Sequence, residues 1–247
     1  MDTRIRLDTA LVTRGLCSSR TEAKVLIEKG LVRVSGEICQ RPAKNISSST
    51  KVELLGKRSF VSRGGEKLEG CLIDMYGTTE RIRKNMVGKS ILDVGSSTGG
   101  FTDCLLSFGA SHSDCVDVGT GQLHSSLRQD TRVRLFEQED IRDFRSMDAY
   151  DIIAVDVSFI SLSRIVDSLI MLGTKGRTEY FILIKPQFEV GRGNTKKGVV
   201  KDRSLIDVTI EHVRRDFFSH GLRHIKILPA RIAGGDGNQE YFLYGKM

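Results

Sequence analysis

The sequence predicts an α/β protein: a doubly wound, seven-stranded, mostly parallel sheet preceded by a small α+β domain. Two observations carry this prediction. From residue 90 onward, short apolar runs that end in an acid or a lysine alternate with stretches of helical period, as strands and helices alternate in such sheets. Residues 1–60 show a different pattern, two short helices followed by a small hairpin.

Positive charge is concentrated at the start of the chain. The 247 residues have a formal net charge of +7, and residues 1–60 hold 12 Lys or Arg against 6 Asp or Glu, a net charge of +6. Residues 61–247 hold 26 Lys or Arg against 25 Asp or Glu, a net charge of +1. A basic module joined to a nearly neutral domain indicates a polyanionic partner, either nucleic acid or an acidic membrane. An ordinary solvated face would carry the same charges.

No segment predicts export, a membrane span or a metal site. The first six residues are not followed by an apolar run, and no uncharged run approaches the roughly 18 residues that a span needs. The five cysteines show no C-x-x-C spacing, and the five histidines form no ligand-like pair. We therefore expect a cytoplasmic protein with reduced thiols and without a metal.

The N-terminal module is expected to contain two helices and a hairpin. Apolar positions predict a short helix over 4–17 that Gly15 closes. Ser19 followed by Glu22 is a capping box, which predicts a second helix that Gly30 ends. Three short strands are expected at 31–34, 37–39 and 51–55.

This order of elements resembles the S4 RNA-binding domain. The resemblance covers about residues 4–55 and is most specific over 19–23 and 30–36. It implies that the basic surface faces a structured RNA, mostly through phosphates. A small capping subdomain without RNA contact is the alternative. The candidate RNA-binding residues here are Arg4, Arg6, Arg14, Arg20, Lys24, Lys29, Arg33 and Arg41.

The S4-like domain is expected to occupy residues 1–57 and the larger domain residues 64–247, joined by a linker at 58–63. Gly64 and Gly65 should give a flexible entry to the first helix of the larger domain, and residues 77–89 should form a polar connection. Its strands are expected at 90–94, 133–136, 151–156, 180–185, 224–228 and 239–244, with one further strand that ends in residues 115–118. Its helices are expected at 101–108, 161–172 and 203–219.

The stretch from Ser90 to Asp103 organises the larger domain. It predicts a strand, a glycine-rich turn and a helix, so the backbone can approach a ligand and the first N–H groups of the helix can face it. In an open α/β sheet this loop lies where ligands bind. Ser97 stands where a dinucleotide fingerprint needs glycine, so a dehydrogenase is the least favoured enzyme. A merely structural turn is the alternative.

The same loop resembles motif I of the S-adenosylmethionine-dependent methyltransferases, through the pattern Asp-x-Gly-x-x-x-Gly-Gly. This resemblance implies S-adenosylmethionine as the cofactor. The residues that it implies in cofactor binding are Asp93, Gly95, Ser96, Ser97, Thr98, Gly99, Gly100 and Phe101.

Two further acids follow neighbouring strands and are candidates for cofactor binding. Asp117, followed by Val118, lies 22 residues after Gly95 and could accept hydrogen bonds from ribose hydroxyls. Asp140 could reach an adenine amino group. Either residue could instead be a helix cap or a turn residue.

Four charged residues are expected near the same edge of the sheet. Lys185 ends a strongly apolar strand and Asp156 ends its neighbour, so the two should pair beside the glycine loop. Asp156 would also contact the cofactor. Glu240 begins the last strand, and Lys67 begins a helix that could fold over this edge. A structural cluster of salt bridges would explain the same four residues.

In order and flanking sequence, Lys67, Asp156, Lys185 and Glu240 resemble the Lys-Asp-Lys-Glu tetrad of the FtsJ/RrmJ-type ribose 2′-O-methyltransferases. With the S4-like start, the chain from about residue 4 to its end is similar to the TlyA, or hemolysin A, family of ribosomal RNA methyltransferases. The resemblance implies a Rossmann-like class I methyltransferase sheet and 2′-O-methylation of a cytidine in ribosomal RNA. The chain stops soon after Tyr244, as in shorter members associated with 23S rRNA only, and 16S rRNA stays open.

This family resemblance implies a proton acceptor among the four residues. A ribose hydroxyl is a weak acid, and a lysine amine can take its proton near neutral pH only if burial and nearby cations lower the lysine pKa to about 7–8. We assign this role to Lys185, with Lys67 positioning the hydroxyl and with Asp156 and Glu240 orienting the lysines and the ribose. Carboxylates beside a lysine raise its pKa instead, and the sequence does not decide which of these opposing effects is larger.

Two other functional classes are weighed against the methyltransferase. An RNA-binding assembly factor with a vestigial site would not need the intact loop and tetrad. A pore-forming protein would need a signal, a span or a strongly amphipathic basic helix. We expect a monomer that binds ribosomal RNA or a ribosomal subunit. The candidate RNA-binding residues outside the first domain are Arg63, Arg192, Lys196 and Lys197, of which the last three lie in a loop that could equally be solvated.

Overall fold

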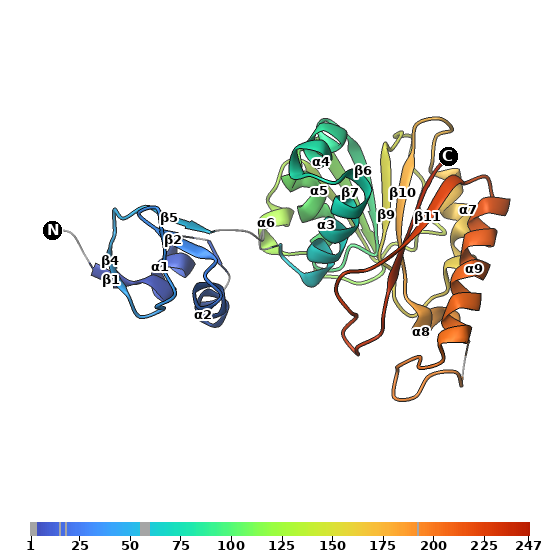
Figure 1. Cartoon of the computed structure of the whole chain (residues 1–247). Coiled ribbons are helices and arrows are strands. Elements are labelled where there is room, and N and C mark those ends of the chain that lie inside the picture. Colours follow the sequence, from blue (N-terminus) through green and yellow to red (C-terminus); the bar gives the residue numbers. More distant parts are fainter. Residues whose placement is uncertain (1–3, 15, 18, 55–59, 192) are drawn as a thin grey trace. The chain divides into compact units, whose positions relative to one another are not determined.

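The computed structural model describes residues 4–14, 16–17, 19–54, 60–191 and 193–247 (Figure 1). The chain divides into two compact units, Met1–Ser59 and Phe60–Met247, each with its own hydrophobic core. The predictions made for Gly15, for Arg192 and for most of the segment 55–59 fall outside the described residues.

The first unit packs two helices, α1 (Leu7–Thr13) and α2 (Arg20–Glu28), on short strands. As the capping box predicts, the Ser19 side chain accepts a hydrogen bond from the Glu22 amide at 3.2 Å. The helix expected over 4–17 is shorter than predicted, because β1 (Arg4–Arg6) pairs antiparallel with the unpredicted strand β4 (Asn45–Ser47). The other strands are β2 (Val32–Val34), β3 (Glu37–Ile38) and β5 (Val52–Leu54), in the order β3-β2-β5.

The second unit confirms the predicted seven-stranded, mostly parallel sheet, in the order β11-β12-β10-β9-β6-β7-β8. β12 runs antiparallel to both of its neighbours, β10 and β11, whereas the four described pairings from β10 to β8 are parallel. The chain runs outward from β6 and returns to β9 on its other side, which places a ligand crevice at the carboxyl ends of these two strands. The strands are β6 (Ser90–Val94), β7 (His112–Asp117), β8 (Val133–Glu137), β9 (Ile152–Val155), β10 (Glu179–Ile184), β11 (Arg223–Pro229) and β12 (Tyr241–Lys246).

Helices cover both faces of this sheet because its strands are apolar on both faces. In β9, Ile152 and Ala154 belong to one core, and Ile153 and Val155 belong to the other. The first face carries α3 (Arg63–Tyr76), α4 (Thr79–Met86), α5 (Gly100–Ser107) and α6 (Ser125–Arg128). The second carries η1 (Leu162–Arg164), α7 (Val166–Met171), α8 (Pro186–Glu189) and α9 (Arg203–Ser219).

Several sequence predictions need correction in this unit. The connection expected over 77–89 contains α4, since Thr78 accepts a hydrogen bond from the Arg81 amide at 3.3 Å and Ile82 and Met86, one turn apart, are buried. The helix expected over 161–172 divides into η1 and α7. The last strand begins one residue after Glu240. The short helices α6 and α8 were not predicted.

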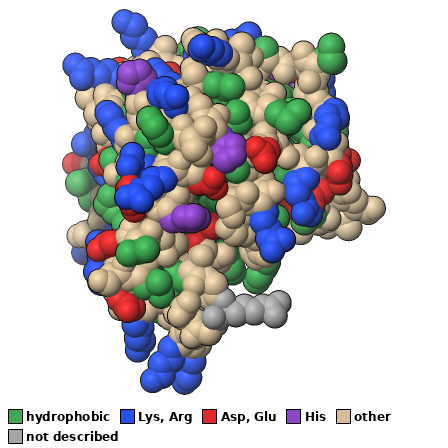
Figure 2. Space-filling model, turned by 90° about the vertical axis from the view of Figure 1, so that its right-hand side faces the viewer, with side chains coloured by type: hydrophobic (Ala, Val, Ile, Leu, Met, Phe, Trp, Pro, Cys, Tyr) green, Lys and Arg blue, Asp and Glu red, His purple; other side chains and the backbone are tan. Residues whose placement is uncertain are grey.

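The second unit has a mixed surface. Figure 2 shows Lys and Arg side chains intermingled with acidic and apolar ones on the face where α9 runs, as expected from a net charge of +1 over residues 61–247. None of the helices in the described part of the chain is long and apolar enough to cross a bilayer.

Candidate active site

The glycine-rich loop bends tightly between β6 and α5. Gly95 and Gly99 have φ values of 75° and 94°, and Ser97 between them has 46°. A Cβ atom at Gly95 would lie 2.8 Å from the backbone oxygen of Asp156, so only glycine lets the loop approach the end of β9 this closely. At the other end of the loop, α3 and α5 approach each other through Gly65 and Gly100, where a Cβ on Gly65 would lie 2.8 Å from the Gly100 oxygen.

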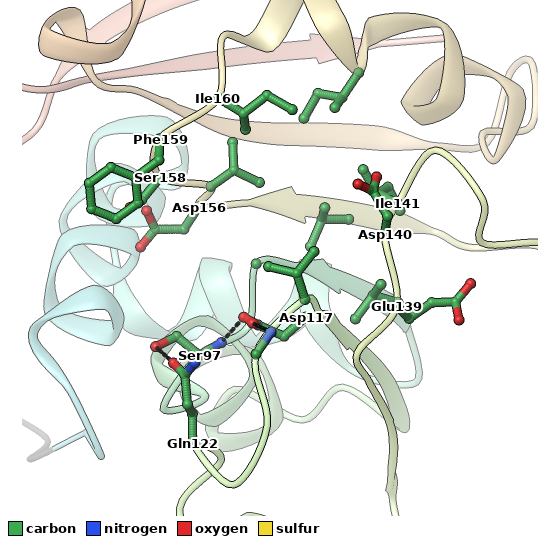
Figure 3. Close-up of a pocket in the computed structure, with 17 residues that line it drawn as sticks. Ser97, Asp117, Gln122, Glu139, Asp140, Ile141, Asp156, Ser158, Phe159 and Ile160 are labelled. Carbon is green, nitrogen blue, oxygen red and sulfur yellow. Dashed lines mark hydrogen bonds between the residues drawn. The ribbon is translucent and has the colours of Figure 1, made fainter.

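A cavity of about 390 Å³ opens beyond this loop, at the carboxyl ends of β6, β7 and β9 (Figure 3). Asp117 lies on its wall, where one carboxylate oxygen accepts a hydrogen bond from the Ser97 amide and the other from the Gly119 amide, both at 2.7 Å. The size suits a small organic ligand. Its apolar lining is Val94, Val116, Val118, Ile141, Val157, Phe159, Ile160 and Ile165.

Asp140 also lines this cavity, but it has the hydrogen bonds of a turn residue. Its carboxylate accepts from the Arg142 backbone amide at 2.9 Å and from the Arg142 guanidinium at 2.9 and 2.6 Å. The guanidinium holds the pKa of Asp140 at about 2, so this carboxylate stays ionised.

A second, polar cavity of about 250 Å³ adjoins the first, and both are lined by Gly95, Ser97, Asp156 and Ser158. Gly99 lines neither cavity, because it faces the side chains of Leu123 and Leu127. The second cavity is also lined by Ser62, Arg63, Gly64, Lys67, Asp93, Ser96, Thr98, Gly100, Phe101 and Lys185.

Two ion pairs stand at this second cavity. Because β9 and β10 are parallel neighbours, Asp156 and Lys185 leave the sheet at the same edge, and the Lys185 Nζ lies 2.7 Å from Asp156 Oδ1 and 2.8 Å from Ser158 Oγ. Lys67 projects from α3, and its Nζ lies 2.5 Å from Glu240 Oε2. The Lys67 and Glu240 side chains are only 9% and 3% exposed. The structure therefore brings Lys67, Asp156 and Lys185 to one cavity, with Glu240 bound behind Lys67.

Buried acceptors without a donor lie beside these pairs. Asp93 is fully buried; its Oδ2 accepts from the Thr102 amide at 3.0 Å and hydroxyl at 2.7 Å, while its Oδ1 has no hydrogen-bond partner among the residues that the structure describes. The Oγ of Ser96 has none either. Burial raises the pKa of Asp93 to about 7, although the Thr102 hydrogen bonds oppose the shift.

Phe159 is a candidate residue that the sequence analysis missed. It lines the first cavity next to Asp156 (Figure 3), is 90% exposed, and has a φ of 65°. Its ring centroid lies 5.1 Å from that of Phe188. A bulky residue at positive φ is strained, and such strain clusters at functional sites. The sequence signal is weak, a phenylalanine three residues after the acid that ends a strand.

Asn238 was also missed. Its buried side chain joins two loops, since Oδ1 accepts from the Val200 amide at 3.0 Å and Nδ2 donates to the Gly198 oxygen at 2.9 Å. This connects the basic loop that carries Lys196 and Lys197 to the turn before Glu240. Both lysines are exposed, and neither lines the two cavities.

The other candidate RNA-binding residues differ in their surroundings. Arg6 and Arg20 both bind the buried Asp8, Arg6 at 3.1 and 2.8 Å and Arg20 at 3.2 Å. With Lys24 they line a concave surface of the first unit. Arg14 instead donates to the backbone oxygens of Ser47, Ser48 and Thr50, which gives it a structural role. The remaining candidates that the structure describes are exposed: Arg4, Lys29, Arg33, Arg41 and Arg63.

No metal centre appears in the described ranges, where no three His, Cys, Asp or Glu side chains gather as ligands. The five cysteines are buried, and none of them forms a disulfide within the described ranges.

Comparison with known proteins assigns both units. The FtsJ-like methyltransferase family matches residues 60–247, and the S4 domain matches residues 5–52. The 16S/23S rRNA (cytidine-2′-O)-methyltransferase TlyA of Mycobacterium tuberculosis is 37% identical and covers 99% of this chain and 90% of its own length. The 23S rRNA (cytidine-2′-O)-methyltransferase TlyA of Campylobacter jejuni is 35% identical, and the match covers 94% of this chain and 96% of the relative. A solved structure from Streptococcus thermophilus, named a hemolysin, is 33% identical with a TM-score of 0.69 and covers 100% and 90% of the two chains.

Proposed function

This chain belongs to the FtsJ-like methyltransferase family, and from that membership we propose that it methylates the ribose 2′-oxygen of a cytidine in ribosomal RNA. The observation that carries the proposal is the meeting of Lys67, Asp156 and Lys185 at one polar cavity beside the glycine loop, with Glu240 bound to Lys67. The preferred substrate is 23S rRNA, and 16S rRNA is the second candidate, since the two TlyA relatives are named for one or both.

The residues of the two adjoining cavities fit S-adenosylmethionine, which supplies an electrophilic methyl group on a sulfonium. The unpartnered Asp93 Oδ1 and Ser96 Oγ are acceptors that an ammonium group needs. Asp117 would hold the ribose hydroxyls. Val118 and Asp140 would lie along the adenine. A buried carboxylate with a free oxygen is costly in an empty site, and a cation there would relieve that cost.

The second cavity is suited to proton removal and alignment. Lys185 takes the proton of the 2′-hydroxyl in its neutral amine form, and Asp156 and Ser158 fix the direction of its Nζ. Lys67, anchored by Glu240, donates a hydrogen bond to the ribose. Much of the rate then comes from holding oxygen, methyl and sulfur in line.

Exposed groups around the cavity suit an RNA substrate. The Phe159 ring gives a base displaced from its stack a surface beside Asp156. Arg63 is exposed at the polar cavity and can bind the phosphate of the target nucleotide. In the first unit, Arg6, Arg20 and Lys24 present charge to RNA phosphates. The proposal includes a monomeric, cytoplasmic enzyme.

The test is methyl transfer from labelled S-adenosylmethionine to ribosomal RNA that lacks the modification. Wild type should give label in nuclease-resistant 2′-O-methyl dinucleotides. Lys185→Ala should lower turnover at least 1,000-fold while its affinity for the cofactor stays within threefold, because the general base is lost and the first cavity is intact. Lys175→Ala, which removes an exposed lysine outside both cavities, is the control and should behave as wild type.

Two results would contradict this proposal. Near-normal turnover by Lys185→Ala would remove Lys185 from catalysis. Absence of label on 23S rRNA, 16S rRNA and both ribosomal subunits, with the cofactor still bound, would favour an RNA-binding assembly factor.

A further inference from the structure

The loop between β9 and η1, residues 156–161, carries groups that both cavities share. Asp156 and Ser158 contact Lys185, and Phe159 holds an exposed ring at a positive φ. A residue in this conformation is strained and persists only where surrounding groups hold it. The stability of this loop therefore depends on contacts from outside it.

The segment from Lys185 to Glu189, at the end of β10 and in α8, provides such contacts at three points. Lys185 contacts Asp156 and Ser158, and the Phe188 ring packs on Phe159 with centroids 5.1 Å apart. The third point is Glu189, which the sequence analysis did not single out. Its Oε2 accepts from the Ser161 hydroxyl at 2.7 Å and its Oε1 from the Leu162 amide at 3.0 Å.

The environment of Glu189 combines partial burial with hydrogen bonds from uncharged donors. Glu189 is half-buried and forms no ion pair within the described part of the chain, so an amide and a hydroxyl are its donors. The charged or titratable groups that face it are His212 and Asp216 of α9. Burying a carboxylate without a cation is costly, and its hydrogen bonds fix the direction of the groups that donate them.

Glu189 also supplies a cap that the loop lacks. The Leu162 amide is the first of η1, and Ser161, at the cap position, accepts no hydrogen bond from a backbone amide of that helix, although its hydroxyl lies 2.9 Å from that of Ser163. The carboxylate thus fixes the point where loop 156–161 enters η1.

We propose that Glu189 is a positioning residue for methyl transfer: through Ser161 and Leu162 it holds loop 156–161 so that the Phe159 ring stays at the cavity and Asp156 and Ser158 stay within reach of Lys185. This inference rests on the proposed function, because it names the groups that Glu189 aligns for that reaction. Glu189 itself lines neither cavity and does not touch the reacting atoms.

Full-length variants assayed for RNA methylation test this proposal. Glu189→Ala should lower kcat/KM for RNA at least tenfold, with cofactor affinity within threefold of wild type. Glu189→Gln should stay within threefold, since its carbonyl can accept from Leu162 and its amide can donate to the Ser161 oxygen. Equal losses in both variants would overturn the role of these hydrogen bonds.

A double-mutant cycle separates positioning from general destabilisation. If Glu189 acts through the loop, the double variant Phe159→Ala/Glu189→Ala should lose kcat/KM by a smaller factor than the product of the factors lost in the two single variants. Multiplicative effects would overturn the proposal. Glu179→Ala is the matched control, because Glu179 lies at the opposite end of β10 and binds Tyr76, Tyr244 and Lys246. An equal loss of activity in that control would mean that Glu189 acts only on overall stability.

Amide hydrogen exchange gives a readout that does not depend on activity. Exchange over residues 157–162 should be at least tenfold faster in Glu189→Ala than in wild type and unchanged in Glu189→Gln. Unchanged exchange in the alanine variant would overturn this proposal. An inactive wild type with the expected exchange pattern would instead contradict the proposed function and leave the holding role of Glu189 intact.

Discussion

At the residue scale, the proposed role of Asp93 in ligand binding depends on its burial. It is fully buried with one oxygen unpartnered, and its pKa of about 7 lies above the value of an exposed aspartate. Because the folded state holds this proton more tightly than the unfolded state, the ligand-free protein loses stability as the pH rises from about 4 to about 7. A bound cation that pairs with the carboxylate would lower this pKa and recover the lost stability.

The affinity for S-adenosylmethionine should therefore depend on pH. Below pH 7 the Asp93 carboxyl is neutral and cannot pair with an ammonium, so affinity should fall close to tenfold between pH 7.5 and pH 6. Calorimetric titration at both pH values would measure this, and uptake or release of protons would appear as a buffer-dependent heat. Asp93→Asn should bind more weakly at pH 7.5 and show a flat profile. A flat profile in wild type would remove Asp93 from ammonium binding.

At the element scale, the close approach of α3 and α5 depends on glycine. A Cβ at Gly65 would lie 2.5 Å from Phe60 and 2.8 Å from the backbone oxygen of Gly100. A Cβ at Gly70, later in α3, would have the stem of the Arg231 side chain, and no backbone atom, as its nearest neighbours, at 3.1 to 3.4 Å. The two positions thus share one helix and differ in whether the neighbouring atoms can move.

Gly65→Ala should accordingly destabilise the second unit by about 1–3 kcal/mol, because backbone atoms would have to shift. Gly70→Ala should be neutral or stabilising by up to about 1 kcal/mol, since alanine favours the helix. Chemical denaturation of both variants would measure the difference. Equal stability of the two variants would mean that α3 and α5 can separate at no cost.

The elements that were predicted correctly are those whose signals are local. The glycine loop, the strands around it and the cap at Ser19 follow from adjacent residues. Helix α4 was missed because charged residues surround Ile82 and Met86 in its short sequence. The β1–β4 pairing joins segments about 40 residues apart, and no local pattern indicates it. In the site, the Lys185–Asp156 pair follows from adjacent strand ends, whereas Phe159, Asn238 and Glu189 depend on loop conformations that the sequence does not specify.

At the scale of the whole molecule, charge is divided between the two units. Residues 1–60 hold nearly all the net charge, and the arginines among them have different partners. Arg6 and Arg20 bind the carboxylate of Asp8 and line a concave surface with Lys24, whereas Arg14 binds three backbone oxygens. Arg6 and Arg20 are therefore better suited than Arg14 to bind RNA phosphates.

Removing these arginines should separate RNA binding from folding. The double variant Arg6→Ala/Arg20→Ala should weaken RNA binding and reduce the slope of log Kd against log salt by about 1 to 2, because each phosphate contact releases about one counterion. Arg14→Ala should instead lower stability by about 1–3 kcal/mol, because the carbonyls lose their donors. Filter binding over a salt series and denaturation would test both. An unchanged salt slope in the double variant would exclude these two residues from the RNA interface.

The ion pair between Lys67 and Glu240 spans 173 residues, and β12, which follows Glu240, lies between β10 and β11 in the sheet. Closing so long a segment is entropically expensive, and contacts of this range form late when a chain folds. The glycine loop and the strands beside it can assemble from neighbouring segments well before that closure. A partly folded chain can thus hold the cavity beside the glycine loop while the proposed site of proton transfer is still incomplete. During refolding we therefore expect ligand binding to recover before turnover.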